Sequence, residues 1–373
     1  MIIDELAGIA HDPRKSVDEH IARTGKKAIG CFPVYSPEEL VYAAGMLPVG
    51  MWGGQTDISK ATQYLQSFCC SIMKANLENG LNGVYDALSM AIIPTFCDTL
   101  KCMGEVWKTA VPKPECFTFV FPQNRKLEAG VDFMRSELER LRARLEGISG
   151  AKIGDGDIER AIAVYDEYRA AARDFVKTSP SYPLTVNARV RHNVLKAAFF
   201  MDKAEYAAKL RAATAELKAL PPEDGGSRGV VLTGLLAEPD GFLDLFADSR
   251  LHVAADDLVQ ESKQFRVDAP KEGASPLDRL ARRLSDMDGC SLLYDSARTR
   301  GQKILGMVKD TGAAGVVVCM MKFCDPEEFD YPIYKKELEK AGVPLLYLEI
   351  EQKMDSAEQL RTRIQTFAEM LGA

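Results

Sequence analysis

An uninterrupted apolar run places the strongest restriction on how this chain can fold. Gly315–Met321 contains no charged residue, which is typical of a strand buried on both faces of a parallel sheet. A proline-containing loop that holds Cys324 follows the run, and residues 334–341 then have the pattern of a helix. Because open α/β sheets bind ligands beyond the carboxyl ends of their strands, Cys324 is expected at such an edge.

Similar apolar strands alternate with helical segments at both ends of the chain. The alternation predicts two α/β units with parallel sheets. Each unit repeats the order helix, Ala-Gly, proline and strand, at residues 38–52 and 334–350, so we interpret the units as related. The expected strands cover residues 27–32, 47–52, 90–93 and 116–121 in the first unit, and 229–234, 252–255, 315–321 and 344–350 in the second.

Helices are expected before, within and between these units. The apolar residues from Val131 to Ile148 follow a three-four spacing, which predicts one packed helix. The run PPEDGGS at 221–227 is typical of a linker. The other expected helices are a short helix or arm within 1–26, 38–44, 62–80 with Cys69 and Cys70 inside it, 158–176, 187–201, 204–220, one opened by Ser275, and a last one capped by the segment 355–358.

The domain organisation follows from these patterns. We predict an α/β fold in which a helical section joins two parallel-sheet domains. The expected limits are residues 1–130 for an N-terminal domain that carries Cys70 and Cys97, 131–225 for the helical section and linker, and 226–373 for a C-terminal domain that carries Cys324.

Charge and hydropathy exclude several classes of protein. The net charge of -7 argues against a nucleic-acid-binding protein, which needs a basic face. No apolar stretch approaches the roughly 18 to 20 residues that span a bilayer. The segment Met1–Leu6 becomes acidic at once, unlike a signal peptide, so a cytoplasmic location is expected.

Several familiar catalytic motifs are absent from the sequence. There is no phosphate-binding loop of the form GxxxxGK[ST] and no GxSxG elbow. The pair Gly154 and Gly156 follows no strand and lacks a third glycine, so it is interpreted as a turn. The four histidines show no metal-ligand spacing.

The nine cysteines remain as the candidate chemistry. No CxxC pair occurs, which disfavours a zinc ribbon or a bacterial ferredoxin. Cys97 and Cys324 both follow an apolar strand and precede a helix, where a thiolate is stabilised by the helix N-terminus. Spacing alone leaves two interpretations open, a metal cluster and a set of buried, incidental thiols.

A group of motifs resembles the 2-hydroxyacyl-CoA dehydratase family, and most closely its β subunits of the isocaproyl or glutaryl type. The resemblance runs nearly from end to end. The motifs that carry it are PVYSPEE at 33–39, GMWGG at 50–54, FCCSIM at 68–73, CDTLKC at 97–102, PQNR at 122–125, KFCDPEE at 322–328 and RTRI at 361–364.

The resemblance implies two Rossmann-like domains and an oxygen-sensitive lyase that removes water from an (R)-2-hydroxyacyl-CoA to give an (E)-2-enoyl-CoA. In this family one injected electron converts the thioester into a ketyl radical anion, which expels the hydroxyl group. Each chain holds one [4Fe–4S] cluster through three cysteines. By motif these are Cys70, Cys97 and Cys324, and the runner-up ligands are Cys69, Cys102 and Cys319.

The resemblance assigns the remaining cysteines to packing. Cys102 and Cys319 are expected to pack because each is offset from its loop, and Cys31, Cys116 and Cys290 are expected as strand or core thiols. The segment 123–125 either lines the cleft or caps a helix. Asp256, Asp257 and Glu261 form either a helix start or an interface. Ser36 stands where some relatives carry cysteine, which argues against an obligate ligand there.

The resemblance also implies partners. These are a homologous α subunit, which takes most of the substrate contacts, and a transient ATP-hydrolysing iron–sulfur activator protein. In this reading the cluster of the β chain relays the electron. Two alternatives stay open: a subunit of a benzoyl-CoA-reductase-like or double-cubane iron–sulfur reductase, and a cluster-free structural subunit.

Overall fold

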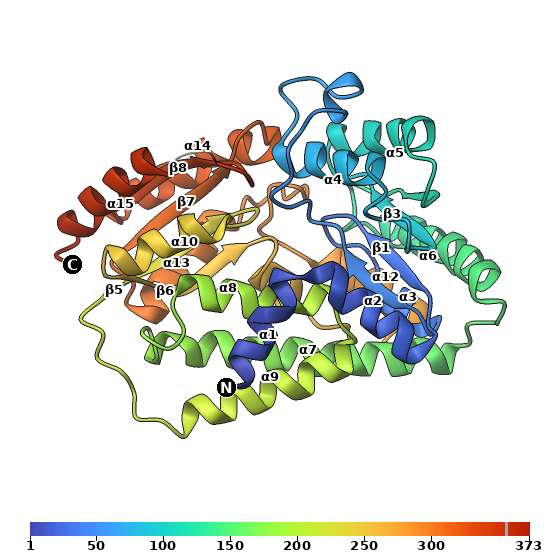
Figure 1. The fold of residues 1–373 in the computed structure, drawn as a ribbon, viewed down its shortest axis with the longest axis horizontal. Coiled ribbons are helices and arrows are strands. Elements are labelled where there is room, and N and C mark those ends of the chain that lie inside the picture. The colour runs from blue at the N-terminus through green and yellow to red at the C-terminus, as the bar shows by residue number, and fades with distance from the viewer. Residues whose placement is uncertain (355–356) are drawn as a thin grey trace.

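The computed structural model describes residues 1–354 and 357–373. Two lobes, each built on its own sheet, stand side by side, and the helices α7 (Asp155–Thr178) and α9 (Lys203–Lys218) run along one side of the molecule (Figure 1). Helix α7 contacts α3 (Glu38–Ala43) in the first lobe and α12 (Pro276–Asp286) in the second. The helical section therefore joins the two lobes.

The two sheets have the same topology. The first contains β1 (Ala28–Cys31), β2 (Leu47–Gly50), β3 (Met90–Pro94) and β4 (Cys116–Phe119) in the order β2-β1-β3-β4. The second contains β5 (Arg228–Gly234), β6 (Leu251–Leu258), β7 (Gly315–Met321) and β8 (Leu345–Ile350) in the order β6-β5-β7-β8. Every pairing is parallel. The predicted fold of two related parallel-sheet units is confirmed, while the expected limits at residues 130 and 225 stay predictions.

The strands form because their side chains can be buried on both faces. All seven residues of β7 are buried, as are all five of β3. The helices that cover the sheets supply the facing apolar side chains, such as Trp107 and Leu338. The remaining helices are α1 (Ile2–His11), α2 (Pro13–Thr24), α4 (Ser71–Leu81), α5 (Asp98–Ala110), α6 (Glu128–Ser149), α8 (Ala188–Lys196), α10 (Asp240–Asp248), α11 (Ser262–Phe265), α13 (Arg300–Thr311), α14 (Asp325–Lys340) and α15 (Glu358–Met370).

Two helix boundaries differ from the prediction near the cysteines. Helix α4 begins at Ser71, so Cys69 and Cys70 precede it. The reason is Glu78, whose carboxylate accepts hydrogen bonds from the backbone of Ser59 and Ala61 and folds that segment back onto α4. Helix α14 begins directly after Cys324, because a proline in the first turn needs no backbone N–H partner there.

Other expected boundaries were also wrong or incomplete. Strand β6 continues through Asp256 and Asp257, which the prediction placed beyond its end, because arginine and lysine side chains pair with these buried carboxylates. The expected N-terminal arm is two helices, α1 and α2. The segment 187–201 divides into α8 and a short 3-10 turn, Ala197–Phe199. The predicted cap of the last helix includes residues 355 and 356, which lie outside the described residues.

Candidate functional site

The three expected cluster ligands share one position relative to their helices. Cys70, Cys97 and Cys324 each stand immediately before the first residue of a helix, α4, α5 and α14 respectively. Cys97 follows β3 and Cys324 follows β7, so these two occupy equivalent places after the third strand of each repeat. Cys70 ends the long loop after β2.

Direct contacts bring the start of α4 against the end of β7. The Ser71 hydroxyl lies 3.1 Å from the sulfur of Met321, and it accepts a hydrogen bond of 3.1 Å from the backbone of Gln352. The ammonium group of Lys74 lies 5.8 Å from the centre of the Phe323 ring. Since Ser71 follows Cys70 and Phe323 precedes Cys324, these contacts place two cysteines from different lobes in one neighbourhood.

Electrostatic interactions indicate that the third thiol lies near the first two. Burial raises the pKa of Cys70 to about 12, and the neighbouring Cys97 acts in the same direction. Burial also raises the pKa of Cys324 well above its usual value, with Glu327, Cys70 and Cys97 adding to the shift. Asp325 in turn contributes to the raised pKa of Cys97, whose main cause is burial. Because such interactions weaken with distance, the three thiols gather where the lobes meet.

Backbone N–H groups partly offset the cost of a buried thiolate. Burial dominates the raised pKa of all three thiols, but first-turn amides act against it: those of Ile72 and Met73 at Cys70, of Thr99 and Leu100 at Cys97, and of Glu327 at Cys324. Each thiol therefore faces the positive end of its own helix, which favours an anionic ligand.

This environment suits thiolates bound to iron. Without a metal, burial keeps the three thiols protonated, whereas coordination to a metal ion removes the proton. Among the described residues, no three His, Cys, Asp or Glu side chains lie close enough together to bind one metal ion. A four-iron cluster attaches each cysteine to a different iron, so its ligands need not converge on a single point. The donor set and its surroundings fit such a cluster.

The other cysteines differ in burial. Cys31 and Cys290 are buried, as expected of strand or core thiols, and Cys319 is fully buried inside β7, where it packs. Cys116 is half-buried on β4. Cys69 is buried beside Cys70 and lies 3.8 Å from the side-chain oxygen of Gln66.

The predicted packing of Cys102 is wrong. Cys102 is exposed, because α5 turns Leu100, Met103 and Trp107 toward the core and leaves residue 102 on its outer side. Unlike Cys70, Cys97 and Cys324, this cysteine is therefore exposed, although it lies near enough to Cys69 to add to the raised pKa of that thiol, whose main cause is burial.

Glu327 and Arg300 form a support for Cys324 that sequence reasoning missed. Glu327 is fully buried in the first turn of α14, and Arg300 donates hydrogen bonds of 2.9 and 3.1 Å to its two carboxylate oxygens. Arg300 also donates to Asp257 at 3.0 Å. Although burial opposes ionisation, Arg300 and Lys263 lower the pKa of Glu327, so the carboxylate stays charged. The motif CDPEE contained Glu327, but no local signal pointed to Arg300.

Three other candidate residues from the sequence contact backbone oxygen atoms and hold loops in place. Arg125 is buried and donates to the backbone of Met287 at 2.6 Å and to the backbone of Tyr294, so it fixes the loop after β4 to the second lobe. Gln123 lies 3.5 Å from the backbone oxygen of Phe96, next to Cys97. Ser36 donates to the backbone of Phe32 at 2.9 Å.

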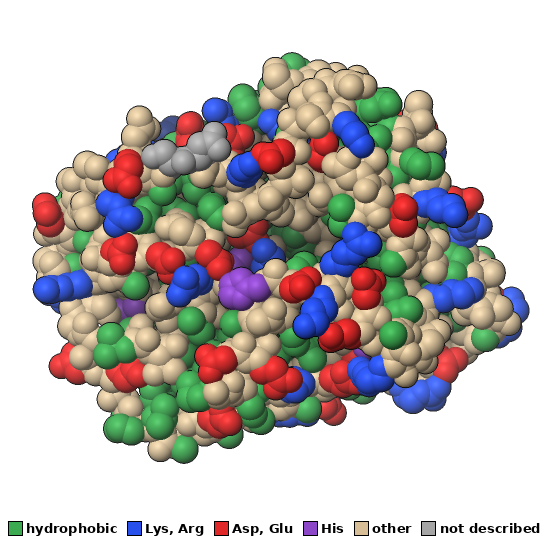
Figure 2. All heavy atoms as spheres, in the orientation of Figure 1, with side chains coloured by type: hydrophobic (Ala, Val, Ile, Leu, Met, Phe, Trp, Pro, Cys, Tyr) green, Lys and Arg blue, Asp and Glu red, His purple; other side chains and the backbone are tan. Residues whose placement is uncertain are grey.

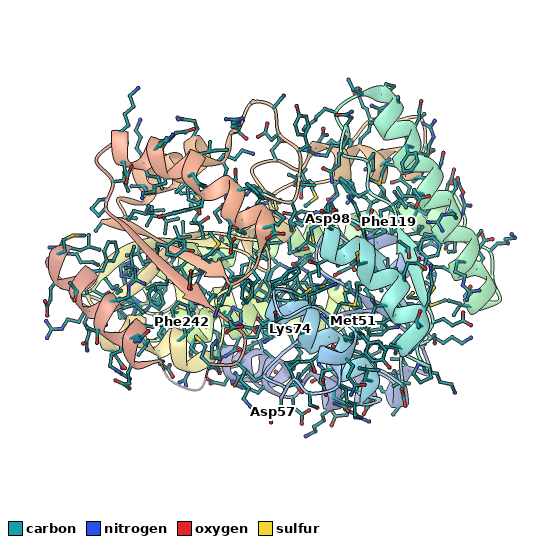
Figure 3. The ribbon with its side chains drawn as sticks, turned by 90° about the horizontal axis from the view of Figure 1, so that it is seen from above. Met51, Asp57, Lys74, Asp98, Phe119 and Phe242 are labelled. Carbon is teal, nitrogen blue, oxygen red and sulfur yellow. The ribbon has the colours of Figure 1, made fainter. Side chains whose placement is uncertain are left out.

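The acidic residues 256, 257 and 261 are buried ion-pair partners, and Glu261 also stands directly before the first residue of α11. Arg191 binds both Asp256 and Glu261, and Glu261 also lies 2.8 Å from a ring nitrogen of His192. Seen from above, Lys74 on α4 and Asp98 at the start of α5 lie where the first lobe faces the second (Figure 3). The cysteine neighbourhood thus occupies the boundary between the lobes, and these acidic residues lie within the second one.

Comparison with known proteins gives consistent results over the whole chain. A family model described as "2-hydroxyglutaryl-CoA dehydratase, D-component" matches residues 33–371. The (R)-phenyllactyl-CoA dehydratase beta subunit of Clostridium sporogenes is 43% identical over 368 residues, which cover 99% of this chain and 98% of that protein. The lactoyl-CoA dehydratase subunit beta of Anaerotignum propionicum is 44% identical over 371 residues, with 99% and 98% covered.

A third relative, the (R)-2-hydroxyglutaryl-CoA dehydratase subunit beta of Acidaminococcus fermentans, is 39% identical over 376 residues and covers 99% of both chains. These relatives differ in the substrate that their names give, yet their identities to this chain are similar, so identity does not single out one substrate branch. None of the helices among the described residues is long and apolar enough to cross a membrane. The family model and the full-length relatives together show that this chain belongs to the 2-hydroxyglutaryl-CoA dehydratase D-component family.

Proposed function

We propose that this chain is the β subunit of a 2-hydroxyacyl-CoA dehydratase and that Cys70, Cys97 and Cys324 hold one [4Fe–4S] cluster. The observation that carries the proposal is the meeting of three thiols from both lobes at one boundary, each on the residue before a helix. Cys70 and Cys324 are buried, and Cys97 is half-buried. The names of the relatives support the subunit assignment, since all three are beta subunits of acyl-CoA dehydratases.

The protein residues bind and orient the proposed cluster. The three helix N-termini stabilise the thiolates, and burial of Cys70 and Cys324 limits contact with water. The pair Arg300–Glu327 fixes the first turn of α14 and with it the backbone that presents Cys324. When bound, the cluster would supply one-electron transfer, which allows a hydroxyl group next to a thioester to leave through a ketyl radical.

The chain is proposed to act with a homologous α subunit and a transient ATP-hydrolysing iron–sulfur activator. The substrate is proposed to undergo dehydration on the α side, so this chain does not catalyse alone. The sequence contains no phosphate-binding loop of its own, which is consistent with ATP hydrolysis by a separate protein.

The test is anaerobic co-purification with the α subunit, followed by iron analysis and assay of several 2-hydroxyacyl-CoAs with activator and ATP. Cys70→Ala, Cys97→Ala and Cys324→Ala should each lose the iron of this chain together with activity. The matched control, Cys102→Ala at the exposed site on α5, should keep both.

Two outcomes would overturn the proposal. Full iron content in all three variants would remove the ligand assignment. About eight rather than about four iron atoms in this chain would instead favour a double-cubane reductase subunit, because a single cubane contains four irons.

A further inference from the structure

A cavity of about 460 Å³ lies between the N-terminal helices and the loops of both sheets, and none of its described lining residues is a cysteine. Its walls come from α1, α2, the end of β2, the loop 52–56, the segment 84–88 before β3, helix α8 and the loop before α10. The face of the molecule that carries α1 and α2 is hollowed near its centre (Figure 2). The volume is in the usual range of small-molecule sites, about 300 to 1,000 Å³.

One wall of the cavity is apolar and aromatic. The side chains of Trp52 and Phe200 are buried, and that of Tyr85 is half-buried. The Tyr85 hydroxyl donates a hydrogen bond of 2.8 Å to Asn76, so the ring is held in place. This wall, which also includes Val17, Val49, Val84 and Leu88, suits an apolar chain.

The rest of the lining is polar, but its charges are already paired. Lys196 binds Glu238, His11 lies 3.0 Å from Asp240, and Arg14 lies 3.7 Å from Asp18. Glu238 is 3% exposed and also contacts His192 and the side chain of Gln352. A ligand that entered with a full charge would compete with these pairs, so the cavity favours a neutral ligand.

Hydrogen-bond donors remain for a neutral polar group. Among the described residues, Glu238 is the acceptor that the Lys196 ammonium contacts, and an ammonium group carries three N–H donors. Lys196 is therefore able to donate to a carbonyl or hydroxyl oxygen inside the cavity. Thr56 adds a hydroxyl group to the lining.

Gln352 separates this cavity from the start of α4. Its amide donates to the backbone of Trp52 at 2.6 Å, its side-chain oxygen accepts from the backbone of Gly54, and its own backbone donates to Ser71. A second, smaller cavity on the other side of Gln352 is lined by Ser71 and Lys74. The large cavity is thus one side chain away from the helix that Cys70 begins.

We propose that the large cavity binds the uncharged acyl-thioester end of an acyl-CoA, with the acyl chain on the Trp52 wall and the thioester oxygen near Lys196. The apolar wall, the paired charges and the free donor are read from the structure, whereas the choice of a thioester rests on the proposed function. The site would be this chain's own, in addition to substrate contacts on the α subunit. Binding of the neutral thioester requires no cluster.

Photolabelling of the αβ complex tests the site directly. The probe is an N-acetylcysteamine thioester whose short acyl chain bears a diazirine, and the labelled residues are mapped by mass spectrometry. We expect labels on the segments 49–56, 84–88 or 196–200, and excess N-acetyl-S-butyrylcysteamine should suppress them at least tenfold. Butyrate, which carries a charge, should not suppress them.

Paired variants separate cavity binding from surface labelling. Ala87 is exposed and lines the cavity, so Ala87→Trp should fill the space and remove the labels. Ala143→Trp, at an exposed site on α6 outside the lining, should keep them. Labels elsewhere, equal suppression by butyrate, or unchanged labelling in Ala87→Trp would overturn the proposal. The labelling assay needs neither iron nor activator. A negative labelling result would therefore leave the cluster assignment unchanged, and loss of iron from the cysteine variants would not change the labelling.

Discussion

The loops after β3 and β7 make the same kind of connection from a strand to a helix, but different side chains are buried beneath them. Each presents a Cys-Asp pair at the start of a helix, Cys97-Asp98 in the first lobe and Cys324-Asp325 in the second. Three residues after the cysteine, the first lobe has buried Leu100, whereas the second has buried Glu327 bound to Arg300. The order of strand, cysteine and helix is the same in both repeats, while the packing beneath it is apolar in one and ionic in the other.

The difference shows that the position of the cysteine is a property of the strand-to-helix connection rather than of the residues below it. Both connections expose first-turn amides to the sulfur, which is a consequence of helix geometry alone. The buried side chain beneath each connection determines which interaction stabilises it. Leu100 stabilises the first lobe by burying apolar surface, and Glu327 stabilises the second lobe through its ion pairs.

Arg300→Met should have the largest effect. It leaves the buried Glu327 without the cation that hydrogen-bonds to it, while Asp257 keeps Lys263 and Arg266, and breaking such a buried pair typically costs about 3–5 kcal/mol. The free energy of unfolding, measured in urea, should fall by that amount. The matched control Arg211→Met, whose pair with Glu167 is exposed, should change it by less than about 1 kcal/mol. Equal effects in the two variants would contradict the ionic support.

Leu100→Ala should have a smaller but clear effect in the first lobe. Removing a buried leucine side chain costs about 2–5 kcal/mol through lost burial and a residual cavity. Because this support is uncharged, the loss should be the same in low and in high salt. A loss that changed strongly with salt concentration would show that the first lobe also depends on charges.

The ionic character of the second lobe also predicts a pH dependence. His192 on α8 is buried, which alone would lower its pKa, but Glu238 and Glu261 outweigh burial and raise the pKa to about 8. A raised folded-state pKa stabilises the protein below the unfolded value of about 6.5, and this contribution is lost as the pH rises through about 8. The shift corresponds to about 2 kcal/mol.

Unfolding measurements between about pH 5.5 and about pH 9, which bracket both values by about one unit, test this linkage. The wild-type protein should lose stability as the pH increases, and His192→Gln should remove most of that slope. A variant with the wild-type slope would show that other groups are responsible.

Cys102→Ser should have the smallest effect. Cys102 lies five residues after Cys97, and Phe329 lies at the same offset from Cys324; both are exposed. The equivalence indicates an outer helix face in each repeat, so the free energy of unfolding should change by no more than about 0.5 kcal/mol. A large destabilisation would break the equivalence of the two connections.

The sequence was informative where local pattern decides the structure. The apolar run at 315–321 became β7 with the predicted limits, since a buried parallel strand leaves no polar residue in the run. The repeat of strand and helix was sufficient to predict two related parallel sheets, and the position after a strand placed Cys97 and Cys324 before helices. These features depend on residues that are close together in the chain.

The features that were missed depend on distant partners. Helix α4 starts later than predicted because Glu78 accepts hydrogen bonds from backbone amides that lie 17 and 19 residues before Glu78 in the chain. Asp257 remains inside β6 because Arg300, 43 residues later, reaches it. The large cavity combines helices at the N-terminus with Gln352 near the C-terminus. No local pattern contains such information.

Anomalous diffraction at the iron edge, from crystals of the αβ complex grown without oxygen, tests the central claim most directly. The account predicts one iron cluster in this chain, at the boundary of the two lobes and bonded to the sulfurs of Cys70, Cys97 and Cys324. Iron bonded to Cys69, Cys102 or Cys319 in place of any of these, or no iron at this boundary, would contradict it.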